Sequence, residues 1–343
     1  MLKATVPLLL LIAATAGSRA NGQDSARDQA MQQIQRQQTL QPADDGIVQA
    51  WVEATFRTLL SGGEPRAFLA AIAHWRDDPQ STSQFVGALA RECARQAAAV
   101  FTNAEVTPAA SAAVATALSD FGERVPMDVL LTGLRSPVAG TRFLMARSVA
   151  SRRATYGTNP TQLASVATAV ISAAASETEP IVVAWLYKCL TVPGSAANAA
   201  VLDHLITVFH GRVEARRAGA SFIDGAENEF LEYIRGSAAA LPQNERNRLL
   251  PDLATYLRAV GERYAASDIG FREQVNAERA LDAVEAVLAG ITATPGGVRT
   301  ALAQGPRTAV LEAVQQAIVA WIGDEATAGV LNGGNYGVER GAP

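Results

Sequence analysis

The sequence predicts an all-α protein built from stacked antiparallel helix pairs, and three observations lead to this prediction. Alanine supplies 68 of the 343 residues and aromatic residues only 6%, whereas β-sheet cores depend on valine, isoleucine and aromatic side chains. Apolar residues recur at spacings of three and four from Asp44 to Gly323. No stretch shows the sustained apolar–polar alternation of a strand. The chain is also 49% hydrophobic with a formal net charge of −4, which excludes disordered and collagen-like proteins.

The helices are placed by their apolar periodicity and by proline and glycine at their ends. The first runs from Asp44 to Leu60 and ends at Gly62-Gly63, since glycine is favoured just after a helix. Prolines open several others, because proline is tolerated in the first turn. The expected helices cover residues 44–60, a segment beginning at 65, and 81–101, 108–121, 127–134, 138–151, 161–175, 180–191, 196–217, 225–239, 242–264, 271–289, 297–303 and 307–322.

Two of these segments repeat one pattern at an offset of 43 residues. Ser136-Pro137-Val138 corresponds to Glu179-Pro180-Ile181. Further along, Phe143 corresponds to Leu186, Ala146 to Cys189, and Val149 to Val192. Helical repeats of about 40–47 residues bury their apolar faces by stacking on neighbouring repeats. The offset therefore indicates a repeat array over residues 44–323.

Residues 136–146, SPVAGTRFLMA, resemble the second helix of a HEAT repeat, with its proline-bearing turn, its arginine at Arg142 and its small residues. The second copy departs from that family at Trp185, which stands where the first copy has Arg142, and the usual asparagine or aspartate of the turn is absent. The recognisable pair covers residues 126–192. The resemblance implies a HEAT-like (armadillo-type) α-solenoid, while other stacked α-hairpin folds and a compact bundle stay open as alternatives.

The first 20 residues have the pattern of a secretory signal peptide. Lys3 precedes an apolar run from Val6 to Ala14, and Ser18-Arg19-Ala20 supplies a small-x-small cleavage pattern. The run is about half of the roughly 20 residues that span a bilayer. We expect cleavage after Ala20, no transmembrane span, and a periplasmic or extracellular product. The mature charge of about −6 argues against a nucleic-acid partner.

Two segments fall outside the helical pattern. Residues 21–43 are rich in glutamine and charge, with Met31, Ile34 and Leu40 as their large apolar groups, so we expect a flexible linker. Residues 324–343 are rich in glycine, and we expect a disordered tail. In the alternative, Leu331 and Tyr336 lay this tail on the helices as a strap.

Little in the chain points to catalysis, cofactors or metals. There are three histidines, and no HExxH, CxxC, GxSxG or phosphate-binding glycine loop occurs. His204 and His210 lie about 120° apart around one helix and cannot share a metal. Asp203, His210 and Glu214 share a face, but exposed polar residues explain this more simply. Glu227, Glu229 and Glu232 could act as catalytic acids, but a solvated face with ion pairs is the simpler interpretation. Lys188 could be a nucleophile, but we expect its stem to pack while its ammonium reaches solvent. Cys93 and Cys189 could form a disulfide, but we expect two buried thiols. We therefore predict no catalytic residues, no metal site and no cofactor.

Arginines form the densest positive group and are the predicted binding residues. They are Arg142, Arg147, Arg152, Arg153, Arg212, Arg216 and Arg217. On neighbouring helices they can present a docking patch for a protein partner or an envelope polymer. The first functional hypothesis is thus an exported, non-enzymatic interaction scaffold. The alternatives are an α-helical envelope hydrolase or lyase acting on polysaccharide or peptidoglycan, and a structural protein that self-associates. A deep pocket with paired carboxylates or a His–carboxylate pair would favour the enzyme.

Overall fold

The computed structural model describes residues 25–193, 199–218, 225–304, 306–333, 336 and 338, and every regular element within them is a helix. The all-α prediction is confirmed. No described helix is both long enough and apolar enough to cross a bilayer. The expected signal peptide lies outside the described residues. The chain divides into two compact units, Met1–Met145 and Ala146–Pro343.

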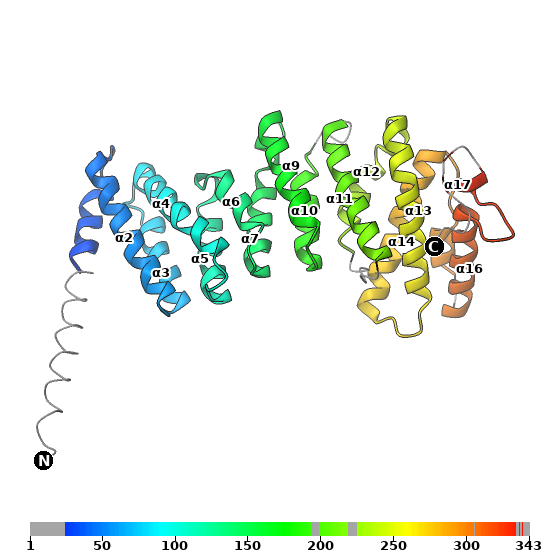
Figure 1. Cartoon of the computed structure of the whole chain (residues 1–343), viewed down its shortest axis with the longest axis horizontal. Coiled ribbons are helices and arrows are strands. Elements are labelled where there is room, and N and C mark those ends of the chain that lie inside the picture. The colour runs from blue at the N-terminus through cyan, green and yellow to red at the C-terminus, as the bar shows by residue number, and fades with distance from the viewer. Residues whose placement is uncertain are drawn as a thin grey trace, which may run out of the picture. The chain divides into compact units, whose positions relative to one another are not determined.

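The first unit consists of helices that pack on their neighbours and on the next helix but one (Figure 1). Pairs of the second kind are α2 with α4, α3 with α5, and α4 with α6. The helices are α2 (Pro42–Leu60), α3 (Pro65–Asp77), α4 (Ser83–Thr102), α5 (Pro108–Asp120), α6 (Met127–Gly133) and the first half of α7 (Ala139–Ser151), with a 3₁₀ turn at Gly122–Arg124. The predicted helix stop after Leu60 is present, because Gly62 adopts a φ of +98° that glycine tolerates best.

The second unit follows the same packing rule. In Figure 1, α9, α11 and α13 form one row, and α10, α12 and α14 form another, in agreement with their contacts. The helices are the second half of α7, then α8 (Arg153–Tyr156), α9 (Pro160–Ala174), α10 (Pro180–Leu190), α11 (Ala199–Arg217), α12 (Asn228–Arg235), α13 (Gln243–Ala265), α14 (Phe271–Thr292), α15 (Val298–Leu302), α16 (Arg307–Ile322) and α17 (Val330–Gly333), with a 3₁₀ turn at Ala238–Ala240.

The 43-residue offset found in the sequence has a direct structural counterpart. The Cys189 thiol donates to the Ala146 carbonyl oxygen at 3.3 Å, so two residues that correspond in the sequence pattern touch in the structure. A contact of this kind is compatible with helix pairs that stack in sequence order. Polar contacts at nearly the same separation recur in both units. They join Leu40 to Gln84, Arg76 to Asp120, Arg95 to Glu53, Tyr233 to Val192, His210 to Asp252, and Arg307 to Tyr264.

The interiors of both units are made largely of alanine and aliphatic side chains from successive helices, with buried phenylalanine, tyrosine and tryptophan rings among them. Cys93 in the first unit and Cys189 in the second are buried free thiols, as the sequence predicts, and burial raises the pKa of each above its ordinary value. Trp75, which precedes a turn rich in charge, is also buried and packs edge-on against Trp51. Buried alanines let helix axes approach closely, which accounts for the alanine-rich composition.

The structure differs from the expectation at both ends of the helical region. Residues 25–34 are helical, Met31 and Ile34 are buried, and the Trp51 indole N–H donates to Asp28 at 2.8 Å. These few apolar groups suffice because α2 supplies the rest of the contact, so the expected flexible linker is not flexible here. After α16, the buried Leu331 and a hydrogen bond from the Asn332 amide to the Ile322 carbonyl hold residues 324–333 on the unit. This part matches the strap alternative rather than a disordered tail.

Candidate functional site

Four of the predicted binding arginines lie at the ends of α7 or on its surface. The Arg142 guanidinium donates to the carbonyl oxygens of Ser136 and Pro137 at 2.9 and 3.1 Å, and so closes the proline-bearing turn before α7. Arg153 donates to the Ala150 carbonyl at 3.1 Å, near the end of the same helix. Arg147 is exposed, and Arg152 is half-buried where α7 gives way to α8. Arg142 therefore satisfies carbonyl oxygens of the turn before α7, whereas Arg153 satisfies one of the last carbonyl oxygens of α7, which the helix itself leaves open.

The arginines of α11 lie in three different environments. Arg212 is buried and pairs with the equally buried Glu227 at 2.9 Å. Arg216 stacks over the Tyr256 ring, with its guanidinium carbon 4.8 Å from the centroid. Arg217 donates to Glu214 and to the Thr255 hydroxyl, both at 2.7 Å. A buried arginine cannot belong to a docking surface, so Arg212 has a structural role; partner binding by the other six remains a prediction.

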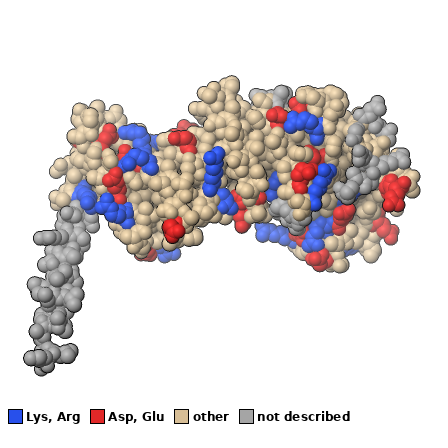
Figure 2. Space-filling view, in the orientation of Figure 1, with Lys and Arg blue, Asp and Glu red and all other residues tan. Residues whose placement is uncertain are grey.

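The surface charge of the molecule is mixed. In Figure 2, basic and acidic side chains are interspersed over the visible face of each unit. Lys188 follows this rule, since its ammonium lies 3.7 Å from Glu229 and 4.5 Å from the centre of the Trp185 ring. Glu232 pairs with Arg235 at 3.7 Å. Glu227, Glu229 and Glu232 thus each have a basic partner, and they do not form a pair of catalytic acids.

An apolar groove opens on the second unit, at the start of α10, α12 and α14. It has a volume of about 760 Å³ and is lined by Pro180, Ile181, Ala184, Gly225, Ala226, Gly270, Phe271, Arg272, Glu273 and Asn276. Two large side chains in it face solvent: Phe271 is 83% exposed and Ile181 is 56% exposed. Val275, one turn after Phe271, is 39% exposed. Contiguous exposed apolar surface of this kind marks interaction sites.

Charged side chains border this apolar groove. The Arg263 guanidinium holds both carboxylate oxygens of Glu273, at 2.6 and 2.7 Å, and the same guanidinium lowers the pKa of Glu273 below its ordinary value. Arg272 is exposed beside Phe271. Glu273 is thus already neutralised, whereas Arg272 presents a positive charge at the edge of the groove.

A smaller groove of about 240 Å³ lies in the first unit between α2, α3 and the helical residues before them. Its lining includes Trp51 and Phe68 together with Arg27, Asp28 and Glu64. Two carboxyl groups therefore share a cavity here. One of them, Asp28, accepts the hydrogen bond from the Trp51 indole described above.

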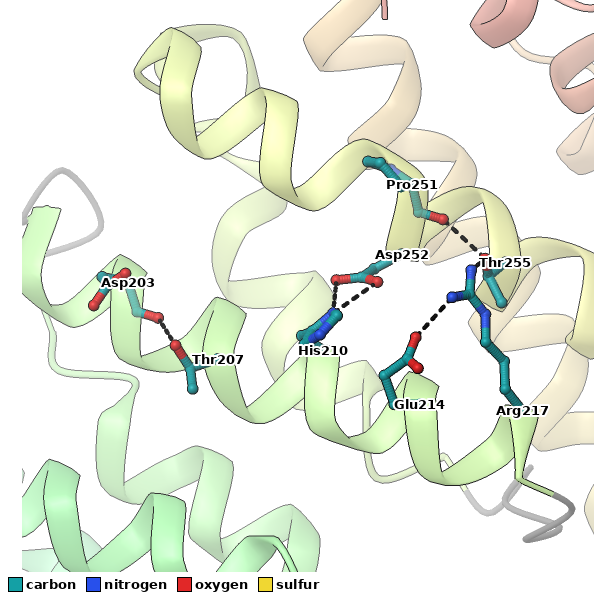
Figure 3. A network of polar contacts seen from close by, with 8 residues as sticks. All are labelled: Asp203, Thr207, His210, Glu214, Arg217, Pro251, Asp252 and Thr255. Carbon is teal, nitrogen blue, oxygen red and sulfur yellow. Dashed lines mark hydrogen bonds and ion pairs between the residues drawn. The ribbon is translucent and has the colours of Figure 1, made fainter. Parts of the chain in front are cut away.

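The described residues contain one group of three side chains that could hold a metal ion, and it forms between α11 and α13 (Figure 3). His210 Nδ1 lies 3.0 and 3.1 Å from the two carboxylate oxygens of Asp252. Glu214, one turn after His210, completes a set whose ligand atoms all lie within 4.8 Å of one another. The Asp252 side chain is 6% exposed and that of His210 is 59% exposed. Burial raises the pKa of Asp252, and the contact with His210 opposes that rise.

Two members of this cluster share a helix face in the sequence pattern, where exposed polar residues were the simpler interpretation and no metal site was predicted. His210 and Glu214 share a face with Asp203, but the Asp203 carboxylate pairs with Arg248 and lies outside the cluster. Asp252 replaces it from a helix that is 42 positions further along the chain. The repeat offset was the signal available in the sequence, because 43 residues after His210 fall next to Asp252.

Comparisons with known proteins identify no relative: no family model, no curated protein and no solved structure matches the chain.

Proposed function

We propose that the chain is an exported, non-enzymatic, HEAT-like repeat protein that acts as a protein–protein interaction scaffold in the cell envelope. The observation that carries this proposal is the apolar groove of the second unit, with Phe271 and Ile181 facing solvent. Full exposure of a phenylalanine leaves a large apolar area in water, and a partner that covers it gains about 25 cal/mol per Å².

The HEAT-like assignment rests on the period. Polar contacts link residues 42–44 apart in both units, as in Arg95 with Glu53, Arg76 with Asp120, and His210 with Asp252. That separation lies within the ~40–47 residues of HEAT and armadillo units. Export rests on the N-terminal pattern of Lys3, the apolar run and the Ser18-Arg19-Ala20 cleavage motif.

The partner of the apolar groove is a protein segment that inserts apolar side chains and carries an acidic residue at its edge. Phe271 and Ile181 supply the apolar contact, and the exposed Arg272 supplies the positive charge beside it. An arginine next to an aromatic anchor is a common composition for the central residues of an interface. The proposed contact is thus on α10 and α14, whereas the sequence pointed to arginines of α7 and α11.

The proposal is tested by capture of a partner from the organism's own envelope extract with the chain from Asn21 to Pro343. Phe271→Glu and Ile181→Glu are the test variants, and Leu60→Glu, at a residue that is 47% exposed in the first unit, is the matched control. Glutamate at the start of α14 favours the helix dipole, so Phe271→Glu should fold normally. We expect the wild type and Leu60→Glu to retain the same protein and the two groove variants to lose it.

A photo-crosslinking residue at position 271 identifies the contact directly. It should join the captured protein, while the same residue at position 60 should not. Equal capture by all three glutamate variants, or crosslinking from position 60 alone, would remove the apolar groove as the binding surface. A triple arginine-to-glutamate variant at Arg147, Arg152 and Arg217 separately tests the arginine prediction, since unchanged capture would exclude it.

The alternative function, an envelope hydrolase or lyase, is favoured by one observation. The groove of the first unit holds the carboxyl groups of Asp28 and Glu64, and paired carboxyl groups in a cavity are the minimum for glycoside cleavage. Release of soluble fragments from purified peptidoglycan or envelope polysaccharide should then be abolished by Asp28→Asn and by Glu64→Gln. No release by the wild type at micromolar enzyme would exclude this alternative.

A further inference from the structure

Asp252 is in an unusual position, because it is a buried carboxyl group whose hydrogen-bond partner is a single, exposed imidazole ring. Its side chain is 6% exposed, and both of its oxygens lie within hydrogen-bond distance of the single nitrogen Nδ1 of His210. Burying a carboxylate is costly unless a cation or several donors compensate. The side chain is aimed at His210 and Glu214 rather than into the apolar interior (Figure 3).

The charged groups around Asp252 are already engaged with other partners. On α11, Arg217 is bound to Glu214 and to Thr255 of α13. On α13, Arg248 is bound to Asp203 and lies 3.6 Å from Glu245. The cluster thus brings two carboxylates together beside one exposed imidazole, and Arg217 at the surface pairs with Glu214 while the buried Asp252 contacts the imidazole. A divalent cation bound among the three side chains would interact with both carboxylates at once.

The spacing of the three side chains suits a small metal ion. Bonds of about 2.0–2.2 Å from zinc to nitrogen and oxygen place tetrahedral ligands about 3.3–3.6 Å apart. His210 Nδ1 and the Asp252 oxygens are already 3.0–3.1 Å apart. Glu214 has to move by about one bond length, since the whole set spans 4.8 Å. That movement breaks its ion pair with Arg217, in which both side chains are more than 40% exposed, and such pairs contribute little to stability.

We propose that His210, Glu214 and Asp252 form a Zn²⁺ site that links α11 to α13. His210 and Glu214, four residues apart on α11, supply two ligands from one helix face, and Asp252 supplies the third from the neighbouring repeat. Water, or a side chain of a partner, fills the fourth position on the exposed side of the cluster. Imidazole with carboxylates favours zinc and related transition metals over Mg²⁺ and Ca²⁺, which prefer sites built from oxygen alone.

A bound metal here has a structural consequence that is independent of partner binding. The site joins two helices that lie 42 residues apart in sequence, and a ligand that binds only the folded chain raises its stability. Bound zinc therefore cross-links α11 and α13 of the second unit. Failure of this proposal would leave the apolar groove on α10 and α14 untouched, because the two sites share no residue.

The test is a zinc titration of chelator-treated protein, carrying no histidine tag, against a competing chromogenic indicator. The variants are His210→Ala, Glu214→Gln and Asp252→Asn. His204→Ala is the matched control, because His204 lies on α11 but does not belong to the cluster. We expect one zinc per chain in the wild type and in His204→Ala, and a loss of affinity of at least about 10- to 100-fold in each ligand variant.

Thermal denaturation distinguishes zinc bound at this site from zinc adsorbed non-specifically on the protein surface. Zinc should raise the melting temperature of the wild type and of His204→Ala and leave that of Asp252→Asn unchanged. Excess Mg²⁺ should not displace the bound zinc. Asp252→Asn keeps the shape of the side chain, so it tests the ligand without opening a cavity. Equal zinc affinity in the wild type and His210→Ala, or no binding by the wild type at tens of micromolar zinc, would overturn the proposal.

Discussion

Glu285 of α14 holds the start of α15 and the end of α16 in place, and its replacement is the most informative stability experiment. The side chain is buried, and one of its oxygens accepts hydrogen bonds from the backbone N–H groups of Gly297 and Val298 at 2.7 and 2.8 Å. The same oxygen accepts the Trp321 indole N–H at 2.9 Å, and the other accepts the Arg299 backbone N–H at 3.2 Å. Four donors from two segments thus meet one carboxylate.

The expected loss follows from which donors can reach water after substitution. Gly297 and Arg299 are exposed, so water can replace the carboxylate at their N–H groups, whereas Val298 and Trp321 are buried. Each buried donor left without an acceptor costs about 1–3 kcal/mol. Glu285→Ala should therefore destabilise the protein by about 4 kcal/mol, and Glu285→Gln, which retains one acceptor oxygen, by about 1–2 kcal/mol.

Urea denaturation followed by circular dichroism measures these losses. For a unit of about 200 residues, 1 kcal/mol shifts the melting temperature by about 2–4 °C, so Glu285→Ala should melt roughly 8–16 °C lower. Hydrogen exchange at the amides of residues 297–299 should accelerate in the same variant. Glu312→Gln is the control, because Glu312 is an exposed residue of α16 and its replacement should change stability by less than about 0.5 kcal/mol. Identical urea midpoints for Glu285→Ala and Glu312→Gln would refute the reasoning.

Three further predictions concern packing, pH and thiol reactivity. A Cβ at Gly133 would clash with Met145 Cγ, so Gly133→Ala should lower the free energy of unfolding measured in urea by about 1–3 kcal/mol. Gly140→Ala, where a Cβ would meet nothing within 4 Å, should raise it by up to about 1 kcal/mol. Equal effects of the two substitutions would contradict this. Arg263 lowers the pKa of Glu273, so the ion pair stabilises the fold above the ordinary pKa of a glutamate and this stabilisation is lost as the pH falls. The difference in melting temperature between the wild type and Glu273→Gln should therefore shrink below about pH 4. A difference that stays constant with pH would count against the ion pair. Burial raises the pKa of Cys93 and Cys189, so a thiol reagent should label neither in native protein and both in urea; rapid native labelling would show that the helices open.

Much of the fold was predictable from local sequence signals. The structure confirms an all-α chain, and most helix ends fall within a few residues of the proline and glycine signals, as for α3 at Pro65 and α16 before Gly323. Apolar spacing and backbone stops act within a few residues, so the sequence contains the information they need. The offset of 43 also has a counterpart in space, since Ala146 and Cys189 are in contact.

The environments of individual side chains required the tertiary structure. Arg212 reads as a surface cation in the sequence, but Glu227 pairs with it in the interior. Residues 25–34 carry too few apolar groups to fold alone, and they are ordered because α2 provides the other half of the contact. Burial depends on what a neighbouring helix supplies, and no local pattern records this.

By itself, the sequence determined the helical class, the helix positions and the repeat offset, because each follows from the spacing of residues along one chain segment. Only the tertiary structure decided which side chains meet. It set Asp252 instead of Asp203 beside His210, and it left Phe271 and Ile181 facing solvent in one apolar groove. These outcomes depend on the register between helices about 40 residues apart or more, and that register is fixed by packing rather than by local propensity.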